Sequence, residues 1–182
     1  CGKITTFTDL QPFNARSGIG VYGTTDCVIQ DCETSGITSL ADTEAICTFF
    51  VDNLLIKNCL SHDNISDSNG GFLGGIEVNF FNNAVIEGSA SYKNIGMQTV
   101  GIWPLVGANL VTNSCQTHEN LGTSFSAGIA IYLVDGGLLT NSQANFNVAK
   151  SENLESRIFC TGIQSASQST VEIQNCSANY NL

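Results

Sequence analysis

GIEVNFFNNAVIEGSASYKN, residues 75–94, is the stretch of this sequence that decides its fold. Ile76 is followed thirteen residues later by Ser89 and eighteen residues later by Asn94. The block recurs six times, and each copy starts at an isoleucine preceded by Gly or Ala: Ile19, Ile46, Ile76, Ile102, Ile129 and Ile163. The residue at offset 13 from that isoleucine is always Cys or Ser: Cys32, Cys59, Ser89, Cys115, Ser142 and Cys176. An asparagine stands at offset 18 in the last five copies: Asn64, Asn94, Asn120, Asn147 and Asn181. A repeat of this length predicts a solenoid or another array of stacked units.

Within each copy the apolar residues alternate with polar ones. Offsets 0, 2 and 4 are mostly apolar, as in Ile76, Val78 and Phe80, and offsets 8 and 10 continue the pattern. Alternation with a period of two predicts strands with one buried face. A polar corner separates the two strands of each copy, and a second corner falls near offset 13. Successive isoleucines are 26 to 34 residues apart, and the variation follows the asparagine, where we expect loops.

Length and composition exclude several classes of protein. The length of 182 residues suits one domain. Of these residues 42% are hydrophobic and 12% are charged. Sixteen acidic against six basic residues leave no basic surface for nucleic acid. No apolar run is long enough to span a membrane. The sequence begins without an initiator Met, and we expect it to be a segment of a larger protein.

One copy cannot bury its own apolar face, whereas copies stacked in register can. We therefore predict an all-β, single-domain solenoid of about six coils over residues 18–182, with residues 1–17 as an N-terminal cap segment. The Gly-Ile…Asn-Cys…Asn blocks resemble the right-handed parallel β-helix of the pectin-lyase-like superfamily. The same architecture occurs in phage tailspikes, viral fibres and bacterial surface proteins. The asparagine row is expected to hydrogen-bond along the solenoid axis and to hold the corners.

The eight cysteines do not form a zinc motif, since no C-x₂-C spacing occurs. Four of them share the offset-13 position, which favours a row of small buried thiols at a corner. Cys32 and Cys59 fall on adjacent coils, within the distance range of a disulfide, but in-register neighbours rarely have the right dihedral angle. We predict no metal site.

The outward face of the first strand is the predicted ligand surface. In enzymes that this sequence resembles, the substrate groove commonly lies along that sheet. Offsets 1 and 3 point outward, which gives this face Tyr22, Phe49, Glu77, Asn79, Trp103, Leu105 and Tyr132. Aromatic rings on an extended face can stack on sugars or form an oligomer contact, so glycan binding and self-association both remain open.

A second group of candidates could carry acid–base chemistry. His62 and His118 share offset 16, each is followed by an acid, and Lys93 lies on the coil between them. An enzyme would draw its catalytic residues from His62, Lys93, His118 and Glu119. The competing interpretation is a solvated polar corner, because a histidine, an acid and an asparagine are typical of turns.

The enzyme hypothesis lacks the motifs that the resemblance would imply. A pectate-type lyase would need calcium and a basic residue beside it, and the polygalacturonase-type signatures are absent. Glu77 is the only acid found on the outward strand face, without an evident partner. We therefore expect a non-catalytic structural or adhesion β-helix without a cofactor, on a cell surface, on a virion or otherwise extracellular. The alternative is a polysaccharide lyase, epimerase or glycoside hydrolase.

Overall fold

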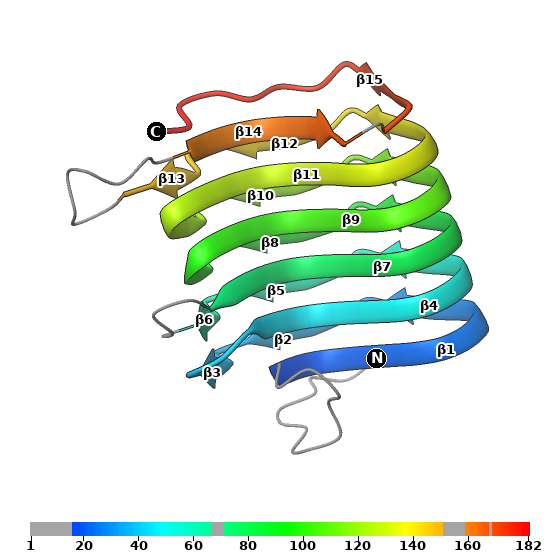
Figure 1. Ribbon diagram of the computed structural model, residues 1–182, viewed down its shortest axis with the longest axis horizontal. Coiled ribbons are helices and arrows are strands. Elements are labelled where there is room, and N and C mark those ends of the chain that lie inside the picture. Colours follow the sequence, from blue (N-terminus) through cyan, green and yellow to red (C-terminus); the bar gives the residue numbers. More distant parts are fainter. Residues whose placement is uncertain (1–15, 67–70, 151–158, 168) are drawn as a thin grey trace.

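The computed structural model describes residues 16–66, 71–150, 159–167 and 169–182. These segments form a parallel β-solenoid of about five turns, and no helix among them could span a membrane (Figure 1). The predicted cap, residues 1–17, lies outside the described residues except for its last two, which belong to the first strand.

Two parallel sheets run along the solenoid (Figure 1). The first sheet contains the long strands that begin each turn: β1 (Arg16–Gln30), β4 (Thr43–Lys57), β7 (Phe72–Glu87), β9 (Ile95–Asn113) and β11 (Leu121–Thr140). Short strands join this sheet at its margins: β3 (Thr38–Ser39), β6 (Ile65–Ser66), β13 (Val148–Ala149), β14 (Phe159–Ala166) and β15 (Val171–Gln174). The second sheet is made of three-residue strands: β2 (Glu33–Ser35), β5 (Leu60–His62), β8 (Ala90–Tyr92), β10 (Gln116–His118) and β12 (Gln143–Asn145).

The repeat isoleucines are aligned from turn to turn, which confirms the predicted register. Each pairs with the isoleucine of the next turn, from Ile19 with Ile46 through to Ile129 with Ile163. Ile46, Ile76, Ile102 and Ile129 are completely buried, and they belong to one hydrophobic cluster that runs through the stacked turns. The core is therefore a continuous column between the two sheets.

Every described residue with a left-handed backbone belongs to one of four rows along the solenoid axis. The row at offset 4 is Gly23, Phe50, Phe80, Val106, Leu133 and Ser167. The row at offset 7 is Asp26, Asn53, Asn83, Asn109 and Gly136. The row at offset 12 is Asp31, Asn58, Gly88, Ser114, Asn141 and Asn175. The row at offset 17 is Gly36, Asp63, Lys93, Glu119, Phe146 and Tyr180. Asn, Asp and Gly tolerate this conformation, which explains why the rows at offsets 7 and 12 consist almost entirely of them.

The row at offset 4 corrects one prediction. Alternation placed Phe80 and its equivalents in the core, but Phe50 is 62% exposed, with φ of 55°. The left-handed residue interrupts the alternation, so the next residue, such as Val51 or Phe81, turns inward instead.

The asparagine row is a buried ladder, as predicted. Asn64 Nδ2 donates to Asn94 Oδ1 at 2.8 Å, and Asn94 Nδ2 donates to Asn120 Oδ1 at 3.0 Å. Asn120 and Asn147 continue the series at 2.9 and 3.0 Å, ending at Asn181. Each amide oxygen also accepts the backbone N–H of the equivalent residue one turn earlier, as Asn120 Oδ1 does from Asn94 and Asn64 Oδ1 does from Ile37. The ladder therefore joins the turns through side chain and backbone together.

Three of the four thiols at offset 13 are buried as predicted, whereas Cys176 in the last turn is partly exposed. Cys32, Cys59 and Cys115 are buried, and all cysteines in the described segments are free, so Cys32 and Cys59 form no disulfide. Cys59 Sγ donates to the carbonyl of Ile29 on the preceding turn at 3.4 Å. Where serine replaces cysteine, its hydroxyl accepts from the preceding turn, as Ser89 does from the Cys59 N–H.

Candidate functional site

The outer face of the first sheet is the side turned away from the core column. The predicted residues at offsets 1 and 3 lie on this face, at paired positions such as Glu77 with Trp103 and Asn79 with Leu105. Their exposure differs from expectation. Tyr22 is 39% exposed, whereas Glu77 and Asn79 are only 4% and 2% exposed. The face is therefore a partly covered surface with polar groups beneath it.

The aromatic residues of this face stack on one another along the solenoid. Tyr22 stacks on Phe49 with ring centroids 5.6 Å apart, and Phe72 stacks on Trp103 at 4.3 Å. Tyr132 meets Trp103 edge-on at 6.5 Å. Small residues make room for these rings, because Phe72, Trp103, Phe125 and Tyr132 pack on a second hydrophobic cluster of Val100, Ala127 and Ala130. A stacked ring presents mainly its edge to the surroundings, so few ring faces remain open for a sugar.

An acid cluster lies beside these rings and consists of Glu44, Cys47, Glu77 and Asn79. Glu44 pairs with Gly74 in the ladder, and Cys47 pairs with Glu77. The Glu77 side chain folds back over Gly74, with Oε2 only 2.5 Å from the place that a Cβ at Gly74 would occupy. Asn79 Nδ2 donates a short hydrogen bond to Glu77 Oε1. Because Gly74 has no side chain, the Glu77 carboxyl can lie over it. The backbone of Glu44 is paired with that of Gly74, about 5 Å away by strand spacing, so the two carboxyl groups lie near each other.

The environment of this cluster opposes negative charge. Burial, reinforced by the charges of Glu44 and Asp42, raises the pKa of Glu77 to about 8, despite the opposing hydrogen bond from Asn79. Burial also raises the pKa of Glu44, which Asp42 raises further. The pKa of the Cys47 thiol is raised by burial and by both glutamates, so this cysteine is a neutral thiol. Burial and the neighbouring acids therefore favour the protonated form of the Glu77 carboxyl.

Four buried polar atoms around this cluster have no hydrogen-bond partner within the described part of the chain. Asn79 Oδ1 is an acceptor and Trp103 Nε1 is a donor, whereas Glu44 Oε2 and Glu77 Oε2 are carboxyl oxygens, which accept when ionised and can donate when protonated. An unsatisfied buried group costs about 1–3 kcal/mol. Such groups are uncommon in folded proteins, and four of them on one face indicate a place where a partner is missing.

Glu44 is the residue that the sequence interpretation missed. It stands two residues before Ile46, and this position lies on the same outer face as offsets 1 and 3. A signal for this residue exists at the equivalent position of other turns. The small residues Gly74 and Ala127 stand there and leave space on the outer face for a neighbouring side chain. Offset −2 and offset 1 are three residues apart, so strict alternation would place Glu44 inward, and the change of side before Ile46 is visible only in the structure.

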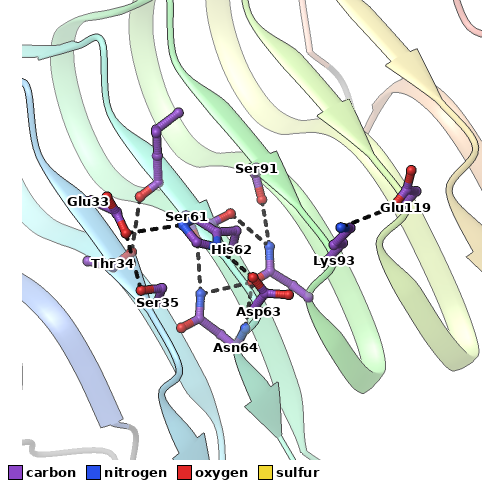
Figure 2. A network of polar contacts seen from close by, with 12 residues as sticks. Glu33, Thr34, Ser35, Ser61, His62, Asp63, Asn64, Ser91, Lys93 and Glu119 are labelled. Atoms are coloured by element: carbon purple, nitrogen blue, oxygen red, sulfur yellow. Dashed lines mark hydrogen bonds and ion pairs between the residues drawn. The ribbon is translucent and has the colours of Figure 1, made fainter.

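The histidine candidates lie in the second sheet and form a separate histidine corner. The rings of His62, Tyr92 and His118 form one stack, in which each histidine ring centroid lies 4.8 Å from that of Tyr92. Figure 2 shows His62 between Glu33 and Asp63, with ring nitrogens 3.3 and 2.7 Å from their carboxylate oxygens. The intervening ring of Tyr92 keeps the two histidines from acting on one atom.

Lys93 and Glu119 lie next to this series. Lys93 Nζ is 4.0 Å from Glu119 Oε2, and His118 Nδ1 is 3.8 Å from Glu119 Oε1. Figure 2 shows Lys93 beside Glu119, away from the contacts of His62. His118 adjoins Glu119 as well, so the structure brings Lys93, His118 and Glu119 together. A shallow cavity of about 210 Å³ adjoins them, lined by Gln116, Thr117, His118, Glu119, Gln143, Asn145 and Phe146.

Neither group is a metal centre in this structure. No set of three or more His, Cys, Asp or Glu side chains among the described residues is placed to hold a metal ion. The histidine corner is a set of partly exposed polar contacts and stacked rings, which is what a polar turn can form by itself. The acid cluster is the more unusual arrangement, because its groups are buried and unsatisfied.

Comparison with known families agrees with the fold. No curated protein matches the chain. A family model described as the right-handed β-helix region matches residues 2–178, nearly the whole sequence. The stacked parallel turns and the matching family model together show that this chain belongs to the right-handed β-helix family.

Proposed function

We propose that this chain is a non-catalytic β-helix that binds glycan on the outer face of its first sheet. The observation that supports this proposal is the group of four unpartnered polar atoms beside aromatic rings. They include the acceptor Asn79 Oδ1 and the donor Trp103 Nε1 beside two carboxyl oxygens, so a complementary ligand must both donate and accept hydrogen bonds within a small area. Sugar hydroxyls do both, and the apolar faces of sugars suit aromatic surroundings.

The position of these atoms defines how a glycan would reach them. Glu77 and Asn79 lie one layer of side chains below the surface, beside the half-buried rings of Phe72 and Trp103. A ligand that displaces one of these rings gains hydrogen bonds that the free protein lacks. The proposal places the protein where polysaccharides occur, in an extracellular setting, on a cell surface or on a virion.

Binding to a glycan panel, measured by calorimetry, tests this proposal. Trp103→Phe keeps an aromatic ring and removes the Nε1 donor, and we expect affinity to fall about tenfold. Phe146→Tyr is the matched control, because Phe146 belongs to a different aromatic stack, with Tyr180 at 5.0 Å. Equal affinity of parent and Trp103→Phe for every bound glycan would show that the ligand lies elsewhere.

Polysaccharide hydrolysis is the second candidate function. The specific observation in its favour is a protonated Glu77 next to Glu44, because a glycosidase requires an acid and a second carboxylate. Mass spectrometry of the same glycans after incubation separates the two functions. Our first proposal predicts unchanged glycans, whereas new oligosaccharides that disappear with Glu77→Gln would establish catalysis. If the new oligosaccharides disappeared with His118→Asn and persisted with Glu77→Gln, the catalytic residues would lie in the histidine corner.

Self-association is favoured by a different surface. Phe50 and Phe80 are 62% and 45% exposed and stack at 4.9 Å on the row at offset 4. Exposed apolar groups of this kind occur at protein contacts. Sedimentation of the unliganded chain distinguishes this alternative, since glycan binding to the outer face requires no second copy.

A further inference from the structure

Glu77 is buried in a place that suits a neutral carboxyl and not a carboxylate. The residue is 4% exposed, and its side chain lies over Gly74. Oε1 accepts one hydrogen bond, from Asn79, and Oε2 has no partner in the described part of the chain. The charged groups that act on it are Glu44 and Asp42, and both are acidic. Loss of its proton would therefore create a buried charge beside other acids, without a counter-ion, which is very unfavourable.

The described strands on either side of Glu77 hold no group that could neutralise this charge. Cys47 pairs with it from β4, and burial together with the charges of Glu44 and Glu77 raises the pKa of that thiol. Trp103 pairs with it from β9 and is uncharged. On its own strand, Asn79 already donates to it. A Glu77 carboxylate must therefore be stabilised by water, because burial opposes the charged form and no cation offsets it.

Water can approach Glu77 only from the outer face, because the other side of the sheet is the core column. The rings of Phe72 and Trp103 are half-buried on that face, and they stack at 4.3 Å. A stacked ring pair contributes far less to stability than an unpaired buried charge costs, so the rings are the groups that give way. Trp103 also gains from moving, since its buried Nε1 has no hydrogen-bond partner in the described chain and would find one in water.

We propose that the carboxyl pair of Glu44 and Glu77 is a pH switch that opens the outer face. When Glu77 releases its proton to solvent, the ring of Trp103 moves outward and water reaches the carboxylate. Ile76 and Val78, on either side of Glu77, stay in the core column, so the turns remain stacked. The switch regulates access to the surface that our proposed function assigns to glycan, and to that extent it rests on that function. The opening itself needs no ligand and is tested on the chain alone.

Trp103 is the only tryptophan in the sequence, so tryptophan fluorescence reports on this position alone. Burial and the charges of Glu44 and Asp42 raise the pKa of Glu77 to about 8, and the outer face should open around that pH. We expect a red shift of the emission and stronger quenching by acrylamide, in one step that spans about two pH units, as for a single proton. Far-UV circular dichroism should stay constant through this step, because the strands remain paired.

Three variants show which carboxyl controls the step. Glu77→Gln cannot ionise and should stay closed over the whole range, without a step. Glu44→Gln removes a neighbouring negative charge and should lower the midpoint by about one pH unit. Glu87→Gln is the matched control, at the far end of β7 in an exposed ion pair with Lys57, and should keep the parent's midpoint.

A parent protein without a step between about pH 6 and about pH 10 would overturn the inference. A step that persists in Glu77→Gln would overturn it too, because another group would then cause the change. So would a parallel loss of the far-UV signal, which indicates unfolding of the turns. A midpoint that Glu44→Gln leaves unchanged would overturn the role of the pair. Glycan binding is measured separately, with the glycan panel, so its success or failure is distinguished from all of these outcomes.

Discussion

At the scale of single residues, Glu77 shows how neighbours decide the state of a side chain. It follows the repeat isoleucine of its turn directly and points away from the core, as sequence alternation predicts. Its burial depends on groups from three strands: Glu44 on β4, Gly74 on its own strand and Trp103 on β9. Alternation predicts the side of the sheet but not the size of each neighbour's side chain. The buried acid pair could therefore not be predicted from Glu77 alone.

The raised pKa of Glu77 makes stability depend on pH. The folded state keeps a proton up to about pH 8, whereas an unperturbed glutamate loses it near 4.5. The stability of the folded state is therefore highest below the unfolded pKa and falls as pH rises toward the folded pKa, by about 1.4 kcal/mol per pH unit. Glu77→Gln cannot ionise, so we expect it to resemble the parent at about pH 5 and to be more stable by a few kcal/mol at about pH 8.

Urea denaturation of the parent and Glu77→Gln at both pH values measures this effect. Glu87→Gln, on the same strand but in an exposed ion pair with Lys57, should retain the pH dependence of the parent. A Glu77→Gln variant with the parent's full slope would mean that Glu77 is ionised in the folded protein.

At the scale of elements, the asparagine ladder joins the turns at one corner. Asn120 is completely buried and makes contacts in both directions along the axis. Its Oδ1 accepts from the N–H and from the Nδ2 of Asn94, and its Nδ2 donates to Asn147 Oδ1. One side chain therefore satisfies polar groups of three turns, which explains a recurring asparagine at a fixed offset.

Asn120→Ala should destabilise the protein by about 3 kcal/mol, because it leaves buried donors of Asn94 without acceptors. Asn83→Gly is the matched control. Asn83 also bonds along the axis, accepting from Asn109 at 3.0 Å, but this ladder is exposed and water can replace its contacts. Glycine suits the left-handed backbone at residue 83, with φ of 60°. Similar losses in the two variants, measured by chemical denaturation, would refute a special role for burial.

The corners also show which parts of the fold can be predicted from the sequence. The inward rows and the polar corners follow from alternation and from Asn, Asp and Gly, and the structure confirms them. Phe50 and Phe80 were misplaced, because bulky residues rarely adopt a left-handed backbone and no local signal marks the exception. Their stacking across turns is a tertiary contact, at 4.9 Å, which no pattern within one turn can reveal.

At the scale of the whole molecule, the solenoid has one core that every turn shares. The buried cluster extends from Ile19 to Ala144, and Ile163 and Val171 pack against it. Each turn contacts mainly its neighbours, so stability depends on the interfaces between turns. A defect in a middle turn weakens the interfaces on both of its sides.

Ile129→Asp tests this arrangement and the register together. Ile129 is completely buried in β11, between Ile102 and Ile163 on the adjacent turns. An unpaired charge there should cost several kcal/mol and abolish the cooperative thermal transition. Leu133→Asp is the matched control, four residues away in the same strand. Leu133 is 48% exposed with φ of 53°, and aspartate tolerates that backbone, so we expect a melting temperature close to that of the parent. If circular dichroism showed Leu133→Asp to be the more damaging change, offset 4 would face the core and the assigned corners would be wrong.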